Sequence, residues 1–304
     1  MRAAHEAAAA QHYPHGALYI VATPIGNLAD ITLRALHVLA LVDCIACEDT
    51  RHTQGMLRAY GIDKAPAQLL SLHQHNEAEA AQVVLARLQQ GERIAYVSDA
   101  GTPGVSDPGA RLVTVVQTAK LKVVSVPGVS SVTAAISVAG AVAAPGASAA
   151  GFLFAGFLPS KSGERAAAIE KLRGESRCVV LLEAPHRIEG LATALKVCGD
   201  RPVTLAREMT KQFESITTLP AQTVAAWLKE DANRSRGEFV VVLHPEQPMQ
   251  DTDVLTESLL PQLLAVLPLK TAVRIVADVT GGSKNELYEK ALQMRAKEDG
   301  DTSP

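Results

Sequence analysis

A glycine-rich loop between an apolar run and an amphipathic run constrains the fold of this chain more than any other stretch. The apolar residues 94–97 lead into residues 98–109, which hold three glycines and two prolines. Glycine reaches backbone angles that are closed to other residues, and proline stiffens a turn, so such a loop is both tight and fixed. The pattern predicts a strand, a ligand-binding loop and a helix, with Asp107 as the N-cap and Pro108 at the first helical position.

Asp99 stands where the predicted strand ends. In open α/β sheets, ligands bind in the crevice beyond the carboxyl ends of the strands. We therefore expect Asp99 to face a pocket, where it would accept hydrogen bonds from a ribose hydroxyl or an amine. The alternative is that Asp99 only closes the turn.

The same strand-and-loop arrangement occurs twice more. A strand predicted over residues 17–22 runs into a loop at 23–27, and a strand at 122–126 runs into a Pro-Gly loop at 127–131. Helical patterns separate these units. Strands that alternate with helices form a mostly parallel α/β sheet with a ligand crevice at one edge.

Two polar clusters follow further predicted strands. Residues 48–53 hold two carboxylates, an arginine and a histidine, and residues 73–77 hold two histidines two positions apart. Such a histidine can move a proton or contact a phosphate. A helix start capped by Asp49 or Thr50 explains the first cluster equally well.

Cys44 and Cys47 form a CxxC pair within a predicted strand over residues 41–47. Strand side chains alternate between faces, so positions three apart point to opposite sides of the sheet and do not readily share a metal. The chain has no second CxxC to complete a zinc site. We therefore interpret both thiols as structural and expect no metal ion.

The length of 304 residues suggests about two domains with cores of their own. We expect a disordered extension over residues 1–16 and an N-terminal α/β domain with the cofactor loops over 17–131. A second α/β domain over 132–245 is expected to have a mixed sheet, because strand patterns follow each other there without a helix between them. Residues 253–304 are predicted to form a small helical appendage.

Charge and hydropathy narrow the functional classes. The net charge is −3, so no global field draws the protein to nucleic acid, and an RNA partner must meet a local basic patch. No apolar run reaches membrane-spanning length, and four cysteines do not make a disulfide framework in a chain of this size. We expect a cytoplasmic enzyme with no membrane contact.

Nine short motifs then point to a family. Four are strand-end loops and helix starts at 23–28, 30–36, 98–104 and 126–131, and five are polar motifs at 47–53, 73–77, 183–187, 207–211 and 237–240. The first four resemble the tetrapyrrole methylase superfamily, the class III S-adenosylmethionine-dependent methyltransferases. The other five resemble one subfamily, which methylates a cytidine ribose 2′-hydroxyl in 16S rRNA. The resemblance runs from about Leu18 to Leu243, and more loosely through the tail.

The resemblance implies two α/β domains with S-adenosyl-L-methionine in the cleft between them, a homodimer, and 16S rRNA or the assembled small ribosomal subunit as substrate. The implied cofactor-binding residues are Pro24, Ile25, Asp99, Gly101, Thr102, Ser130, Ser131 and Leu182. The first loop has one glycine where many relatives have more, so it is expected to shape the substrate entrance more than to grip the cofactor.

The chemistry needs an oxygen aligned behind the methyl group and a group that removes its proton. The candidate general bases are Glu48, His75 and Glu208, among which the sequence does not choose. Candidate substrate-binding residues are Arg51, Asn76, Arg187 and Lys211. Two other functions stay open at this stage: a methyltransferase for a small molecule such as a tetrapyrrole precursor, and a non-catalytic module that senses S-adenosylmethionine.

Overall fold

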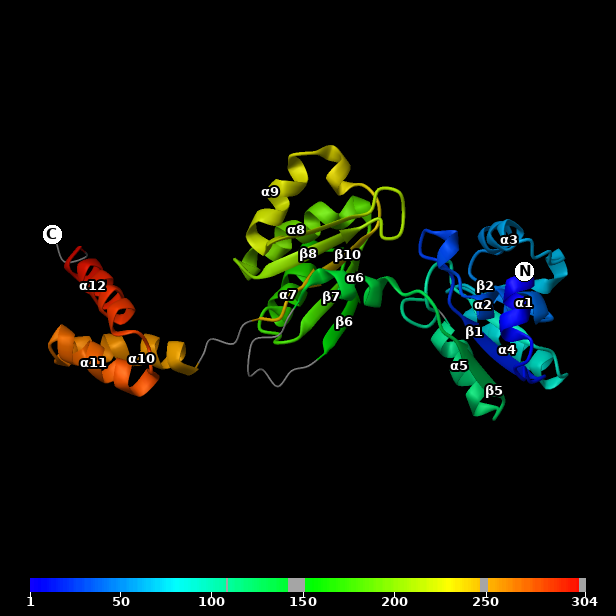
Figure 1. The fold of residues 1–304 in the computed structure, drawn as a ribbon, viewed down its shortest axis with the longest axis horizontal. Coiled ribbons are helices and arrows are strands. Elements are labelled where there is room, and N and C mark those ends of the chain that lie inside the picture. Colours follow the sequence, from blue (N-terminus) through cyan, green and yellow to red (C-terminus); the bar gives the residue numbers. More distant parts are fainter. Residues whose placement is uncertain (108, 142–150, 247–250, 301–304) are drawn as a thin grey trace. The chain divides into compact units, whose positions relative to one another are not determined.

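The computed structural model describes residues 1–107, 109–141, 151–246 and 251–300. The chain divides into two compact units, of which the first extends to Glu246 and the second begins at Gln247. The first unit contains two five-stranded sheets, and the second contains three helices (Figure 1).

The first sheet is entirely parallel and has the order β3-β2-β4-β1-β5. Its strands are β1 (Ala17–Val21), β2 (Cys44–Cys47), β3 (Leu69–Ser71), β4 (Ile94–Val97) and β5 (Lys122–Val126). The strands β1, β2 and β4 are almost completely buried, which explains their continuous apolar sequence. The predicted α/β class with a mostly parallel N-terminal sheet is confirmed.

Helices cover both faces of this sheet. On one face, α2 (Leu33–Leu41) and α3 (Thr50–Ala59) pack against Tyr19, Ile45 and Val97. On the other, α4 (Glu77–Gln89) and α5 (Gly109–Thr118) pack against a second apolar cluster. Cys47 belongs to the first cluster and Cys44 to the second. The two thiols therefore face opposite sides of the sheet, as their spacing predicted.

The strand order places a topological switch between β1 and β4. From β1 the chain crosses toward β2 on one side, whereas from β4 it crosses toward β5 on the other. Loops that leave two neighbouring strands in opposite directions open a crevice at the carboxyl ends of those strands. The loops in question are the two that the sequence singled out, at 23–27 after β1 and at 98–109 after β4.

Polar side chains fix where the helices begin. Asp49 is the N-cap of α3, since its carboxylate accepts hydrogen bonds from the backbone N–H groups of Arg51 and His52 at 2.8 and 3.2 Å. The carboxylate of Asp107 accepts from the backbone N–H groups of Gly104 and Gly109 at 2.6 and 2.9 Å. This agrees with an N-cap at Asp107, while the expectation for Pro108 lies outside the described residues.

The N-terminal residues differ from the expected disordered extension. Arg2–Ala8 forms the helix α1, in which Ala4 and Ala8 are buried, and α1 packs against α2. The hydroxyl of Tyr13 donates to the carbonyl of Ala8 at 3.1 Å. A run of small alanines allows this close approach between helices, although it gives little hydrophobic signal in the sequence.

The second sheet has the order β6-β7-β10-β8-β9 and mixes both strand directions. Its strands are β6 (Phe152–Phe157), β7 (Cys178–Glu183), β8 (Pro202–Arg207), β9 (Ser215–Pro220) and β10 (Phe239–Leu243). β6 and β7 are parallel, whereas β10 runs antiparallel to β7 and β8, and β8 and β9 form a hairpin. The predicted mixed sheet is confirmed.

Two apolar clusters lie on the two faces of the second sheet. On one face it carries α7 (Ser162–Leu172), α8 (Ile188–Leu195) and α9 (Val224–Lys229). On the other, α6 (Ser131–Ala139) packs against Val180, Ala206 and Val242. Because α6 directly follows the third loop of the first sheet, it carries the chain from one sheet to the other. The boundary that we set at residues 131 and 132 stays a proposal.

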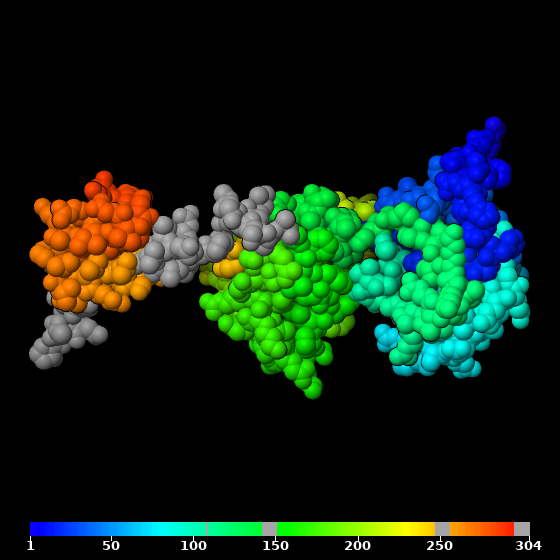
Figure 2. All heavy atoms as spheres, turned by 90° about the horizontal axis from the view of Figure 1, so that it is seen from below, coloured from blue at the N-terminus to red at the C-terminus, as the bar shows by residue number. Residues whose placement is uncertain are grey.

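The second unit consists of α10 (Asp251–Val266), α11 (Leu269–Thr280) and α12 (Lys284–Gly300). Leu260, Val276 and Leu287 bring the three helices around a small core of their own, the compact orange and red body in Figure 2. The sequence also predicts two connecting stretches, one rich in alanine, proline and glycine at 140–151 and a polar one at 245–252. Of these, residues 142–150 and 247–250 lie outside the described residues. In the described parts of the chain, no helix combines the length and the apolar character that crossing a bilayer requires.

Candidate functional site

Three loops of the first sheet meet above the switch between β1 and β4. The backbones of Thr23 and Gly101 exchange two N–H to carbonyl hydrogen bonds, each 3.0 Å long. The hydroxyl of Thr102 donates to the carbonyl of Val129 at 2.8 Å, which joins the second loop to the third. Gly101 has φ of 81°, a backbone angle that favours glycine. The three bends therefore form one connected rim.

Two adjoining pockets lie beside this rim, and both are lined by Ala100, Ser131 and Leu182. The larger has a volume of about 320 Å³, and the smaller about 210 Å³. We refer to the two together as the cleft. The loops of the first sheet and the carboxyl end of β7 supply its walls, so the cleft needs residues from both sheets.

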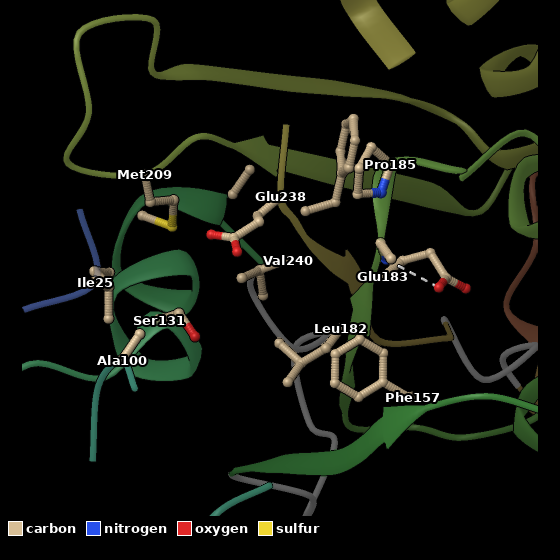
Figure 3. Close-up of a pocket in the computed structure, with 13 residues that line it drawn as sticks. Ile25, Ala100, Ser131, Phe157, Leu182, Glu183, Pro185, Met209, Glu238 and Val240 are labelled. Carbon is tan, nitrogen blue, oxygen red and sulfur yellow. Dashed lines mark hydrogen bonds between the residues drawn. The ribbon is translucent and has the colours of Figure 1, made fainter. Parts of the chain in front are cut away.

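The larger pocket is mostly apolar. Figure 3 shows Ile25, Ala100 and Ser131 on one side, and Leu182 and Phe157 on another. Such a surface suits a flat organic ring better than a charged group. Glu183 is also a lining residue, but its carboxylate is turned toward the N–H group of Ala184, from which it accepts a hydrogen bond of 3.0 Å (Figure 3).

The smaller pocket is acidic. Glu48, Asp99 and Asp107 all line it. Burial, together with the negative charges of Asp99 and Asp107, raises the pKa of Glu48 to about 7. Asp99 is tied to the next loop, because one of its oxygens accepts from the backbone N–H of Asp49 at 3.3 Å. A carboxyl group with a pKa near neutrality can take up and release a proton under physiological conditions.

The residues predicted to bind the cofactor gather at this place. Those that line one or both pockets are Ile25, Asp99, Gly101, Thr102, Ser130, Ser131 and Leu182. Pro24 lines a neighbouring surface hollow that it shares with Asp99. The positions thus lie close together, while their role in binding remains a prediction.

The three candidate bases have different surroundings. Glu48 lies in the acidic pocket. His75 is exposed, stacks edge to face on His73 and lines neither pocket. Glu208 forms an ion pair with Lys211. Although burial favours the neutral acid, hydrogen bonds from Lys211 and from the backbone N–H of Glu238 outweigh it and lower the pKa of Glu208.

The four predicted substrate-binding residues also differ in their surroundings and in the contacts that their side chains make. Arg51 lies with Pro24 and Asp99 in the surface hollow, and its side chain makes no hydrogen bond or ion pair within the part of the chain that the structure describes. Arg187 pairs with the buried Glu183 at 2.9 Å. The Asn76 side chain bridges the backbone of His73 and Ser71 at 2.8 and 3.0 Å.

Lys211, the fourth of these residues, joins the two halves of the first unit. Its Nζ lies 2.9 Å from carboxylate oxygens of both Glu208 and Glu238. Its aliphatic stem covers Gly26, where a Cβ atom would come within 2.4 Å of the Cγ of Lys211. We call this contact between the first loop and the turn after β8 the latch.

Two further features belong to the latch. The hydroxyl of Thr210 accepts a hydrogen bond of 3.2 Å from the N–H of Asn27. Glu208 and Thr210 both have positive φ, 51° and 65°, which is unfavourable for residues other than glycine. Strain of this kind persists only where the surroundings impose it, and here the contacts with Glu238 and Asn27 do so.

Several lining residues of the apolar pocket were not assigned to the site from the sequence, although three of them lie within the motifs 207–211 and 237–240. Phe157, Met209, Phe239 and Val240 are among them. Phe157 ends an apolar strand and is 54% exposed, and an aromatic side chain at a strand end was the only available signal. The others come from strand ends that the chain order places far from the glycine-rich loops, so their convergence depends on the packing of the two sheets.

Comparison with known families gives two matches along the chain. Residues 17–225 match the model of the Tetrapyrrole (Corrin/Porphyrin) Methylases, and residues 250–295 match the RsmI C-terminal HTH domain. The chain is 44% identical to the ribosomal RNA small subunit methyltransferase I of Escherichia coli O157:H7, over 92% of this chain and 96% of that protein.

Solved structures share the fold at low identity. The cobalt precorrin-4 methyltransferase CbiF superposes with a TM-score of 0.55 at 18% identity, covering 76% of this chain and 98% of CbiF. A uroporphyrin-III C-methyl transferase from Thermus thermophilus, complexed with S-adenosyl homocysteine, gives a TM-score of 0.50 at 19% identity and covers 75% and 96% of the two chains.

Proposed function

The chain belongs to the tetrapyrrole methylase family, and from this premise we propose that it methylates the 2′-hydroxyl of a cytidine ribose in the 16S rRNA of the small ribosomal subunit. The protein is a methyltransferase, and S-adenosyl-L-methionine is its methyl donor. The high identity to a small-subunit rRNA methyltransferase over nearly the whole chain supports RNA as the substrate in preference to a tetrapyrrole precursor.

The cleft fits this donor in its chemistry. The donor carries an aromatic purine, a ribose with two hydroxyls, a positively charged sulfonium, and an amino acid end with one ammonium and one carboxylate group. The apolar pocket around Leu182 and Phe239 suits the purine, and the acidic pocket around Asp99 suits the positive charges. The Thr102 hydroxyl already donates its proton to Val129, so it is left as a hydrogen-bond acceptor for the ligand.

One observation carries the proposed mechanism: Glu48 lines the same acidic pocket as Asp99, Thr102 and Ser131. The bound cofactor supplies a methyl group on a sulfonium, which is electrophilic without further activation. The protein must then orient the ribose hydroxyl and remove its proton. Orientation of the reactants is worth roughly 7–11 kcal/mol in favourable cases. A general base contributes about 10²- to 10⁴-fold in rate.

We propose Glu48 as this base in preference to His75 and Glu208. The carboxylate of Glu208 already accepts hydrogen bonds from Lys211 and from the backbone N–H of Glu238, so its proton affinity is low. His75 is exposed and lines neither pocket. Glu48 combines a place in the cleft with a pKa near neutrality.

Among the proposed RNA contacts, Arg51 has the surroundings best suited to a phosphate. It lies in a hollow next to the acidic pocket with an unengaged guanidinium group, within the residues that the structure describes. Arg187 and Lys211 are held by carboxylates, and Asn76 by the backbone. We therefore propose that these three shape the site, whereas Arg51 contacts RNA directly.

Methyl transfer from labelled S-adenosyl-L-methionine tests the function. The purified protein is incubated with small ribosomal subunits that lack the modification, with naked 16S rRNA, and with a tetrapyrrole precursor, and the modified nucleotide is mapped by mass spectrometry. Label on one cytidine ribose supports the proposal, and the two RNA arms identify the better substrate. Label on the tetrapyrrole alone, or cofactor binding without any transfer, would refute it.

We also propose that the active form is a homodimer. Phe213, at the turn between β8 and β9, is 69% exposed, and Ile216 on the adjoining edge strand β9 is also exposed. Large exposed apolar side chains of this kind occur at protein interfaces. Light scattering during size-exclusion chromatography, with Phe213→Ser as the comparison, tests this proposal. A monomeric mass for the native chain at micromolar concentration would contradict it.

A further inference from the structure

A second hollow lies away from the cleft, between α7 and α8 on the outer face of the second sheet. It has a volume of about 380 Å³, and Ser162, Arg165 and Gly190 are among its lining residues. None of its lining residues lines either pocket of the cleft. The methyl-transfer chemistry gives this hollow no role.

Arg165 is buried in this hollow, and among the described residues its guanidinium group has no hydrogen-bond or ion-pair partner. The residue is only 9% exposed, and its Nε is inaccessible and has no hydrogen-bond acceptor. Within the described parts of the chain, no carboxylate lies within ion-pair distance of its guanidinium group. The first-turn residue Glu164 pairs instead with Lys161, and the lining residue Glu170 pairs with Arg173.

The chain makes room for this guanidinium group. A Cβ atom at Gly190 would lie 2.7 Å from Nη2 and 3.1 Å from Cζ of Arg165. Only a glycine on α8 lets the planar group lie flat against the helix backbone. A glycine inside a helix destabilises the protein by about 0.5–1 kcal/mol relative to alanine. The close approach of the Arg165 guanidinium explains why α8 has a glycine at position 190 in spite of this loss of stability.

A second buried arginine shows what a purely structural role looks like in this molecule. Arg201 is 6% exposed, and its guanidinium donates to the backbone carbonyls of Leu172, Arg173, Glu175 and His244 at 2.7–3.0 Å. Arg165 has the same depth of burial and none of these acceptors. An arginine does not lose its charge in proteins, and the terminal nitrogens of Arg165 are not among the inaccessible atoms, so this guanidinium is free to bind an anion that enters the hollow.

We propose that this hollow is a binding site for a phosphate group, held by the guanidinium of Arg165. Arginine presents a rigid fork of donors that matches the oxygens of phosphate. Ser162, the first residue of the eleven-residue helix α7, lines the hollow, and no side chain caps this helix. The backbone N–H groups of its first turn are therefore further donors for an anion. The phosphate belongs either to an RNA backbone or to a free phosphorylated molecule.

The proposal does not depend on the proposed methyl transfer and is tested without it. The native protein is titrated with inorganic phosphate at constant ionic strength, with chloride as the reference, while the Nε–Hε resonances of its arginines are followed by NMR. We expect one resonance, lost in Arg165→Met, to shift in a saturable manner. Binding measured by calorimetry should fall at least tenfold in Arg165→Met and remain unchanged in the matched variant Lys171→Met, an exposed cation on the same helix that does not line the hollow.

Gly190→Ala gives an independent variant, because the added methyl group displaces the guanidinium while its charge is kept. It should weaken phosphate binding as well. A short RNA oligonucleotide that competes with phosphate identifies the RNA backbone as the source, and an oligonucleotide that does not compete identifies a free phosphorylated molecule. No saturable shift of the Arg165 resonance in the native protein, or equal phosphate affinity in native protein and Arg165→Met, overturns the proposal.

Discussion

The ammonium group of Lys211 lies 2.9 Å from the carboxylate of Glu208, and this ion pair holds a turn in which Glu208 itself has φ of 51°. The same carboxylate accepts the backbone N–H of Glu238 at 2.8 Å. One side chain thus joins the turn after β8 to the start of β10, beside the apolar pocket that Met209 and Glu238 line. The latch depends on this pair.

Replacing Glu208 with Ala should lower the free energy of unfolding by about 1–3 kcal/mol, because two hydrogen bonds to a partly buried carboxylate are lost. Chemical denaturation measures the change. The comparison is Lys161→Ala, which removes an exposed ion pair with Glu164 and should change stability by less than about 1 kcal/mol. Equal effects of the two substitutions would show that the latch adds nothing to stability.

Gly26→Ala should weaken cofactor binding more than it weakens folding. The new Cβ would overlap the stem of Lys211, which must move and loosen its ion pair with Glu238, a lining residue of the apolar pocket. We expect at least a tenfold loss of affinity for S-adenosyl-L-methionine in calorimetry. Gly55→Ala is the control, since a Cβ at that helical position meets no atom within 4 Å and should leave the affinity unchanged.

The rate of methyl transfer should rise with pH through a midpoint near 7. Burial, Asp99 and Asp107 raise the pKa of Glu48 to about 7, so the carboxylate that accepts the proton predominates only above this pH. Single-turnover rates from pH 5.5 to 8.5 at saturating cofactor measure the profile. Glu48→Gln should lower the plateau by about 10²-fold or more and abolish the pH dependence.

The substitution Asp99→Asn tests whether the charge of Asp99 helps to raise the pKa of Glu48. The negative charge of Asp99 is one of the causes that raise the pKa of Glu48, so its removal should shift the midpoint of the profile to lower pH. A midpoint that stays in place in both variants would assign the titration to another group.

Two helix ends give a paired test of backbone strain. Lys120 follows α5 with φ of 58°, and Gly140 follows α6 with φ of 63°. Lys120→Gly should stabilise the protein by about 0.5–1 kcal/mol, because glycine adopts this angle without steric cost. Gly140→Ala should destabilise it by a similar amount, although no atom lies near the new Cβ. Thermal unfolding measures both changes.

The sequence was a good guide to the parts of the fold that depend on local patterns. The glycine-rich loop at 98–109 and the continuous apolar strands predicted the parallel sheet and the place of its crevice. The helix α1 was missed, because alanines that permit close packing look the same as alanines in a solvated tail.

The residues of the site could be predicted where they lie in a loop with a recognisable sequence pattern. They could not be predicted where the site depends on contacts between the two sheets. Asp99 and Ser131 stand in recognisable loops. Nothing around Lys211 in the sequence indicates that Gly26, 185 positions earlier, lies under its stem. The same limit made Glu208 and Lys211 look like free functional groups, since their mutual ion pair arises only in the folded turn.

The wall of the cleft formed by Phe239 and Val240 has a consequence for the order of events during synthesis. The loops that begin the pocket leave the ribosome first, yet the last lining strand is made more than 130 residues after the loop that carries Asp99. A nascent chain that ends before β10 lacks the wall that Phe239 and Val240 form. We therefore expect the newly made protein to bind its methyl donor tightly only after almost the whole first unit has been translated.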